Sequence, residues 1–366
     1  MSKIWIFNDW HVGVRRSGGT TPYTAHSLRV WMRDQAAHCL SLPQQGDTVI
    51  FNGDLTDKFD IDLSDAWQLL QQLREMVVER GVKLYLAVGN HDLSKDSNKL
   101  GIVQFLGSAL HSFQPDGPSM LIEEPTLLEG GLYVIPHMVN QALFDQALEW
   151  VPAGVTFLLL HCNYDSPFAE HADHSLNLSL GQAQRLRDAG VTMILGHEHH
   201  SRTALDGAVQ IIGNQFPSSV ADCFTPDGRL VEAKQCCVIS QGEIRKLRTW
   251  EHDAERGGAC QISVSTLLES GLTGLDLSAL QGFVRVTGEV LPEQAAEALR
   301  LISRLRQSCN AFVIANAVRV RATADEIEDL MEQIEDVREV NVLEMLMEIL
   351  TPEQQEAVRA VLAIRE

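Results

Sequence analysis

The sequence predicts an α/β protein: a two-sheet sandwich flanked by helices, followed by a small β-α-β cap domain and C-terminal helices. Up to about residue 247, short β-rich apolar runs alternate with longer amphipathic stretches, as in layered α/β domains. The last β-rich runs follow one another without a long helix between them, and we expect them to form a second sheet packed on the first. A charged stretch that ends in a glycine pair then precedes a smaller strand, helix and strand pattern.

Five strands and one long helix define the larger part of the chain. The helix is expected over Ser64–Arg80, where apolar side chains recur at helical spacing and would pack into the core. This stripe comprises Trp67, Leu70, Leu73 and Val77. The strands are Ile4–Phe7, Thr48–Phe51, Val82–Val88, Val155–Leu160 and Val191–Leu195, and the segments expected in the second sheet are Val209–Ile212, Cys237–Ser240 and Ile244–Leu247.

This pattern divides the chain into three parts. They are a large domain at residues 1–256, a cap domain at residues 257–322 and a helical tail at residues 323–366. In the middle part, the cap domain, we expect a strand at Phe283–Val290, a helix from Pro292 to about Ser308 and a strand at Phe312–Arg321. Pro292 suits the first helical turn, where its missing N–H costs little. The tail is predicted to be helical and apolar on one side, and from Arg321 onward it carries 13 acidic and 4 basic residues.

The chain has a formal net charge of −20 and seven cysteines. Such acidity argues against a protein that coats nucleic acid with a broad basic surface, although the tail holds nearly half of the charge. Basic side chains remain near the first motifs to meet phosphates: Arg29, Arg33, Lys95 and Lys99. The odd, irregularly spaced cysteines favour reduced thiols. The start of the chain lacks signal-peptide features and no apolar run approaches roughly 20 residues, so we expect a cytoplasmic protein outside the membrane.

Carboxylate, imidazole and amide side chains follow each of the five strands, at the point where an α/β sheet presents its ligands. They are Asp9 and His11, then Asp54, then Asn90 with His91 and Asp92, then His161, and finally His197 with His199. Residues two apart in an extended segment point the same way, so each pair, at 9/11 and at 197/199, can reach one ion. The glycines at 53, 89 and 196 are expected to let the backbone turn sharply beside the site.

These donors include no thiolate, which suits hard-to-borderline divalent ions rather than a closed structural zinc site. Seven ligands are too many for one ion and fit two ions that share a bridging aspartate. Two ions about 3.5–4 Å apart can activate a water molecule and polarise a phosphoryl group. The sequence therefore predicts a two-metal centre that hydrolyses phosphoesters.

At these residues the sequence resembles the calcineurin-like metallophosphoesterase superfamily, whose blocks DxH, GDxxD, GNH[DE], H and GHxH are all matched. The resemblance implies that Asp54 bridges two ions. It implies a first metal held by Asp9, His11, Asp54 and His199, and a second held by Asp54, Asn90, His161 and His197.

The resemblance also implies roles for three further residues. His91 would contact the scissile phosphate and protonate the leaving oxygen. Asp57 and Asp92 would hold imidazoles or loops in place. Mn²⁺ is the expected ion, and Mg²⁺, Fe²⁺ or Zn²⁺ would also suit the ligands.

Within the superfamily, the chain resembles the SbcD-type nuclease subunit of DNA double-strand-break processing complexes. The features that carry this resemblance are the opening NDWHVG, the GDLTD block, the turn at Ile212–Ser219 and the β-α-β unit. It implies a two-metal-dependent DNA exonuclease and endonuclease that binds DNA, forms a homodimer and docks an SbcC-like SMC-type ATPase through the tail. The alternative for the apolar tail is that it folds back on the cap domain. The chain departs from the family at residues 58–62, which lack its usual Pro- and Ser-containing run.

Several alternatives stay open at this point. Arg15 and Arg16 follow the first motif, where they either contact DNA phosphates or are solvated. His171, His174 and His200 are further candidate ligands, with solvent-facing or supporting positions as the alternative. The function could also be that of a phosphodiesterase or phosphatase acting on a small or protein substrate, or of a scaffold with an inactive centre. The complete ligand set argues against the scaffold, and the cap domain favours the nuclease.

Overall fold

The computed structural model describes residues 2–14, 21–94, 99–113, 120–166, 175–253 and 258–321. The expectations for Arg15 and Arg16, for His171 and His174, and for the tail from residue 323 lie outside these residues. Within the described ranges, no helix combines the length and the apolarity needed to cross a bilayer.

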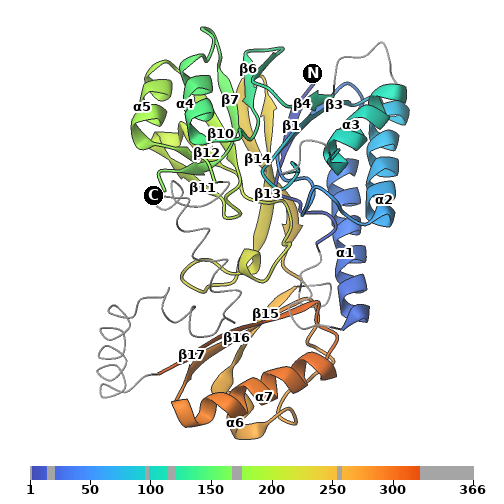
Figure 1. The fold of residues 1–366 in the computed structure, drawn as a ribbon, viewed down its shortest axis with the longest axis vertical. Helices are drawn as coiled ribbons and strands as arrows, with labels where there is room; N and C mark the ends of the chain where they lie inside the picture. The colour runs from blue at the N-terminus through green and yellow to red at the C-terminus, as the bar shows by residue number, and fades with distance from the viewer. Residues whose placement is uncertain are drawn as a thin grey trace, which may run out of the picture.

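The larger domain is a sandwich of two six-stranded sheets flanked by helices, which confirms the predicted fold class (Figure 1). The first sheet has the order β14 (Glu243–Glu251), β13 (Ala233–Ser240), β1 (Ile4–Phe7), β2 (Thr48–Asn52), β3 (Lys83–Ala87) and β4 (Leu121–Ile122). The second has the order β11 (Arg202–Ala204), β12 (Val209–Ile211), β10 (Thr192–Gly196), β7 (Phe157–His161), β6 (Leu132–Ile135) and β5 (Thr126–Leu128).

The five expected strands all form, but the expected division into sheets is wrong. Strands β7 and β10 pair with each other in the second sheet, while the hairpin β13–β14 joins β1 in the first. Strand β12 pairs with β10. Aliphatic side chains from both sheets meet in one layer, among them Ile6 and Ile50 from the first and Leu159 and Ile194 from the second. The metal-binding motifs therefore end on two sheets that face each other.

Helices cover the outer face of each sheet (Figure 1). The first sheet is covered by α1 (Pro22–Ser41), α2 (Leu63–Arg74) with its π-helical continuation (Glu75–Glu79), and α3 (Ile102–Phe113). The second is covered by α4 (Gln141–Glu149) and α5 (Leu180–Asp188), next to the short pair β8 (Asn163–Tyr164) and β9 (Asn177–Leu178). The helix expected over 64–80 forms, yet Trp67 is 59% exposed, because the buried face centres on Leu69, Leu73 and Val77.

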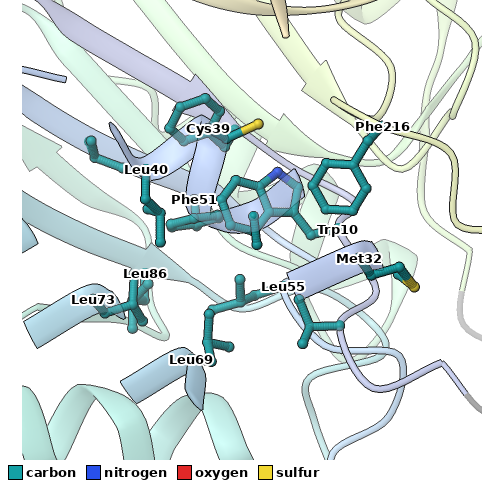
Figure 2. Packing of buried hydrophobic residues seen from close by; sticks show 14 of the residues in the cluster. Trp10, Met32, Cys39, Leu40, Phe51, Leu55, Leu69, Leu73, Leu86 and Phe216 are labelled. Carbon is teal, nitrogen blue, oxygen red and sulfur yellow. The ribbon is translucent and has the colours of Figure 1, made fainter. Parts of the chain in front are cut away.

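The residue between the first two candidate ligands anchors the core. Trp10 is completely buried, its ring lies edge-on to Phe51 with centroids 4.6 Å apart, and it also contacts Phe216. Figure 2 shows this ring among side chains of α1 and α2, including Met32 and Leu69. Burial of so large an apolar surface fixes the loop that follows β1 and with it the residues on either side.

The cap domain contains the expected strand β16 (Phe283–Val290), helix α7 (Pro292–Ser308) and strand β17 (Val313–Val320). It also contains a strand and a helix that the sequence did not predict, β15 (Ala259–Ser263) and α6 (Val264–Ser270). The three strands are parallel in the order β15-β16-β17, and α6 and α7 cover one face.

The other face of the cap sheet meets the sandwich. Phe283 and Phe312 pack against Trp31 of α1, with ring centroids 5.6 and 5.8 Å from it. Figure 1 shows the cap at the end of the sandwich away from the N-terminus, with its sheet between the two cap helices and the sandwich. The cap sheet therefore lies at the end of the molecule towards which β1 runs.

Candidate metal centre

The residues that follow β1, β2, β3, β7 and β10 come together at one edge of the sandwich, which we call the metal edge. Two groups of side chains have ligand atoms within 4.8 Å of one another, Asp9 with His11 and His199, and Asp54 with His161 and His197. A third such group consists of His11, Asp57 and His91. The backbone joins the loops, since Asp9 N–H donates to the Gly53 carbonyl and His11 N–H to that of Asp54.

In the first group, two imidazole nitrogens face each other. His11 Nε2 lies 3.1 Å from His199 Nε2. The other nitrogen of His199, Nδ1, lies 2.7 Å from Asp222 Oδ1, a carboxylate that can only accept a hydrogen bond when ionised. His199 therefore donates from Nδ1 to Asp222, and its Nε2 faces His11 Nε2. A cation held by the two rings would satisfy both nitrogens.

In the second group, too, one nitrogen of an imidazole is held by a hydrogen bond and the other faces possible ligand atoms. His161 Nδ1 donates to the Asn52 carbonyl at 2.8 Å, which leaves Nε2 facing two oxygens. These are Asn90 Oδ1 at 3.1 Å and Asp54 Oδ2 at 3.2 Å. His197 Nδ1 also lies 3.1 Å from Asn90 Oδ1. An imidazole nitrogen that faces a carboxylate and an amide oxygen is the arrangement expected of a metal site, because an ion can take the place of the proton between them.

Asp54 lies between the two groups. Its Oδ2 is 3.2 Å from His161 Nε2 and 3.9 Å from His11 Nε2, and its Oδ1 accepts a hydrogen bond from the His91 backbone at 2.9 Å. Burial raises the pKa of this carboxyl, but the charge and hydrogen bond of His161 and the charge of His11 bring it well below its usual value. Asp54 is thus an ionised carboxylate in the position expected of the bridging ligand.

The electrostatics of the edge favour a cation. Burial lowers the pKa of all four imidazoles, and at His11 and His197 this brings the pKa to about 4. At His161 and His199 the carboxylates of Asp54 and Asp222 outweigh burial and raise the pKa to about 10 and about 9. The donor set and this negative field fit divalent ions of borderline hardness, which would displace the protons that His161 and His199 hold at a raised pKa.

Four of the candidate ligands have a left-handed backbone, which corrects the extended geometry expected for the 9/11 and 197/199 pairs. Their φ angles are 53° at Asp9, 48° at His11, 52° at Asp54 and 86° at His197. Only Gly53, with a φ of 88°, supplies the sharp turn expected of the glycines. Gly89 is needed for close approach instead, because a Cβ there would collide with Asp54. Strain of this kind concentrates at functional sites.

His91 has a defined tautomer and a free nitrogen. Its Nδ1 donates to the Asp57 carbonyl at 2.7 Å, so Nε2 is the atom available to a substrate. Its ring lies edge-on to His11, with centroids 4.8 Å apart, and the side chain is partly exposed. The Asp57 carboxylate is 3.8 Å from His11 Nδ1, beyond hydrogen-bond distance, so Asp57 orients His91 through its main chain.

Asp92 connects two loops of the site. Its Oδ1 accepts hydrogen bonds from the backbone and hydroxyl of Thr56, and its Oδ2 accepts one from the Gly89 backbone. Burial and the charge of Asp54 raise the pKa of Asp92 to about 6. This carboxyl therefore ties the loop after β2 to the loop after β3.

Two residues at the metal edge escaped the sequence analysis. Asp222 holds His199 with one oxygen and accepts hydrogen bonds with the other from Ser218 and from the Ser219 backbone. Lys234 is 5% exposed and donates to the His199 carbonyl at 3.1 Å. The sequence offers two signals for them, a carboxylate three residues after the Ile212–Ser219 turn and a lysine at the second position of β13.

The structure also places three other residues singled out in the sequence, His200, Arg29 and Arg33. His200 belongs to none of the three groups, and burial lowers its pKa. Arg29 and Arg33 were expected to be available to phosphates, but both lie within 4.0 Å of the Asp65 carboxylate. Their charge is therefore partly neutralised.

Comparison with known proteins identifies the family. The calcineurin-like phosphoesterase family matches residues 2–201, more than half of the chain and a range that includes every candidate ligand. No curated protein matches the chain. The family catalyses metal-dependent hydrolysis of phosphoesters, and its fold usually binds two divalent ions, in agreement with the His and Asp groups at the metal edge. The chain belongs to the calcineurin-like phosphoesterase family.

Proposed function

We propose that the chain is a two-metal-dependent DNA nuclease, with exonuclease and endonuclease activity, and the nuclease subunit of an SbcCD-like DNA end-processing complex. The cap domain carries the proposal. Arg285 of β16 and Ala315 of β17 line one cavity with His200 and Ala221, which adjoin His199 and Asp222 of the metal edge. A substrate at the metal edge can thus extend against the cap, which a polymer needs and a small phosphoester does not.

Two of the four sequence features that resemble the nuclease branch, the opening motif and the Ile212–Ser219 turn, also contact each other. Gln215 Oε1, from the turn after β12, accepts hydrogen bonds of 2.8 Å from the Asn8 backbone and from Trp10 Nε1 in the opening motif. Asn8 Nδ2 donates to the Gly213 carbonyl. The turn therefore braces the loop that carries Asp9 and His11, which supports reading both features as parts of one site.

We assign the first ion to Asp9, His11, Asp54 and His199 and the second to Asp54, Asn90, His161 and His197, with Mn²⁺ as the expected metal. When bound, such ions would activate a water nucleophile and stabilise charge on the phosphoryl oxygens. Asp54 holds the two ion sites together. His91, with Nδ1 committed to the Asp57 carbonyl, presents Nε2 to protonate the leaving oxygen.

The proposal includes two protein partners. A second copy of the chain would cover the exposed apolar side chains at the start of α2 and on α3, where Leu63 is 81%, Trp67 59% and Phe105 44% exposed. An SbcC-like SMC-type ATPase would dock on residues 323–366. Sedimentation of the full chain and of Trp67→Ser tests the first partner. Co-purification of the ATPase with the full chain and with a chain ending at residue 322 tests the second.

Parallel assays on DNA and on a small diester test the nuclease proposal. The purified chain is treated with chelator, reconstituted with Mn²⁺ and incubated with labelled single- and double-stranded DNA and with bis(p-nitrophenyl) phosphate. We expect cleavage of DNA and of the diester, both absent before the metal is returned. Hydrolysis of the diester without cleavage of either DNA would reject the nuclease and favour a small-substrate phosphodiesterase.

A further inference from the structure

A cavity of about 300 Å³ lies between the cap sheet and the metal edge. Its walls come from both domains and include His200, Ala221, Phe224, Pro226, Arg285 and Ala315. On the sandwich side, His200 follows the candidate ligand His199, and Ala221 precedes Asp222, which accepts the His199 hydrogen bond. The cavity therefore begins one residue away from the metal edge along two segments of the chain.

An arginine and an aromatic ring face each other in this cavity. The guanidinium carbon of Arg285 lies 5.4 Å from the centre of the Phe224 ring. Val284 and Val286, the neighbours of Arg285 on β16, point into the cap core, so Arg285 projects from the opposite face of the sheet towards the sandwich. Across residues 258–321 and the rest of the described chain, no carboxylate forms an ion pair with Arg285.

The rim of the cavity is a tight turn held by its own hydrogen bonds. Thr225 N–H donates to the Arg229 carbonyl, and Gly228 N–H donates to the Thr225 carbonyl. Phe224 and Leu230 pair across the base of the turn, and Phe224 is 5% exposed. The aromatic wall is therefore fixed before any ligand arrives, which lowers the entropy that binding must overcome.

The chemistry of the walls selects the ligand. Most of the surface is carbon, from Ala221, Phe224, Pro226 and Ala315, so a phosphate drawn to Arg285 would lose its hydration against most of the walls. A flat, neutral aromatic ring can instead stack on the Arg285 guanidinium, which the buried Phe224 ring supports from behind. A nucleobase has this shape and fits within about 300 Å³.

We propose that this cavity is a nucleobase subsite, which binds the base of the nucleotide next to the scissile phosphate. The inference rests on the proposed function and extends it, because it assigns part of the substrate recognition to the cap domain. It also gives Arg285 a role in binding the nucleotide, separate from the hydrolysis at the metal edge.

Two chromogenic diesters test the subsite without relying on DNA cleavage. Thymidine 5′-(p-nitrophenyl) phosphate carries a base, and its matched ester carries an abasic deoxyribose. We expect kcat/KM of the wild-type chain with Mn²⁺ to be about tenfold higher for the thymidine ester, the size of one stacking contact. Arg285→Ala removes the stacking cation and Ala315→Phe fills the cavity, so either change should abolish this advantage and bring kcat/KM for the thymidine ester down to that for the abasic ester.

Arg319→Ala is the matched control, since Arg319 lies on neighbouring strand β17, is exposed and lies outside the cavity. It should keep the tenfold advantage. Equal kcat/KM for the two esters in the wild-type chain would overturn the subsite, as would an equal loss on both esters in Arg285→Ala or loss of the advantage in Arg319→Ala. DNA cleavage without a base effect would leave the nuclease standing and reject the subsite. A base effect without DNA cleavage would support the subsite and reject the nuclease.

Discussion

The metal edge and the cap domain differ in how their backbones are held. At the metal edge, Asp9, His11, Asp54 and His197 all have positive φ. In the described cap residues, 258–321, positive φ occurs only at glycines. A left-handed backbone costs on the order of 1–3 kcal/mol for a residue with a side chain. The metal edge therefore keeps a geometry that its residues would not adopt alone, whereas the cap follows local preference.

The metal edge and the cap domain also differ in which kinds of side chain they bury. The metal edge buries ionisable groups, among them Asp54 at 1% exposure and His161 at 1%, while the core of the cap consists of aliphatic side chains from its three strands and two helices. Anchors such as Trp10 and Gln215 hold the edge in place. We therefore expect substitutions at the edge to remove activity more than stability, and substitutions in the cap core to do the opposite.

The largest effect is expected for Asp54→Asn. Asparagine tolerates the left-handed φ of 52° and keeps the shape of the side chain, so the fold should be retained. The charge that both ion sites share is lost, and we expect the bound metal to fall and kcat to drop by at least about a thousandfold. Elemental analysis and hydrolysis of a chromogenic diester measure the two effects. A variant that keeps its full metal content would show that Asp54 is not the bridge.

A smaller and separable loss is expected for His91→Ala. The ring contacts the Asp57 carbonyl through Nδ1 and would act on the substrate through Nε2, so its removal should leave the ions in place. Loss of the acid should lower kcat by about 10²–10⁴-fold. Metal content near that of the wild type is the decisive control. If the purified variant contains no metal, His91 is a ligand and the acid must be sought elsewhere.

Asp222→Asn should weaken the site without destroying it. The amide can still accept from His199, but its nitrogen cannot accept the hydrogen bonds from Ser218 and Ser219, so the ring loses its fixed orientation. Such supporting residues typically contribute 10–100-fold to metal affinity. We expect activity against Mn²⁺ concentration to shift by about that factor, with the plateau at saturating metal preserved. An unshifted curve with a lower plateau would mean that Asp222 supports the fold rather than the metal.

The gathering of these side chains at the metal edge could be predicted because metal binding restricts which types of side chain can act as ligands. Asp, His and Asn at five successive strand ends form a pattern that few other functions require, and the structure brings these residues together. Their metal roles stay predictions. Asp222 was missed because its role depends on a contact with His199 across 23 residues, which no local pattern indicates. The positive φ at Asp9 and His11 was missed because tertiary contacts override the local preference for an extended chain.

The fold was predictable in class and in most elements, but not in strand pairing. Periodicity locates β7 and β10 without saying which sheet they join, since pairing depends on the other strands. In the cap, β16 and α7 have strong patterns and were found at their observed bounds. Strand β15, with the sequence ACQIS, has a single β-branched residue and was missed.

The smallest effect on hydrolysis is expected from Leu305→Ala in α7. This side chain is completely buried between α7 and the cap sheet, so truncation should leave a cavity and cost about 2–5 kcal/mol of stability. Leu299→Ala on the same helix is the matched control, because Leu299 is 57% exposed and its loss should change stability by less than about 0.5 kcal/mol. Chemical denaturation measures both. Neither variant should change metal content or turnover of a small diester at temperatures where the chain is folded, since no described cap side chain belongs to the groups at the metal edge. A folded Leu305→Ala variant that lost its metal would show that the cap holds the metal edge together, and the contrast between the two regions would fail.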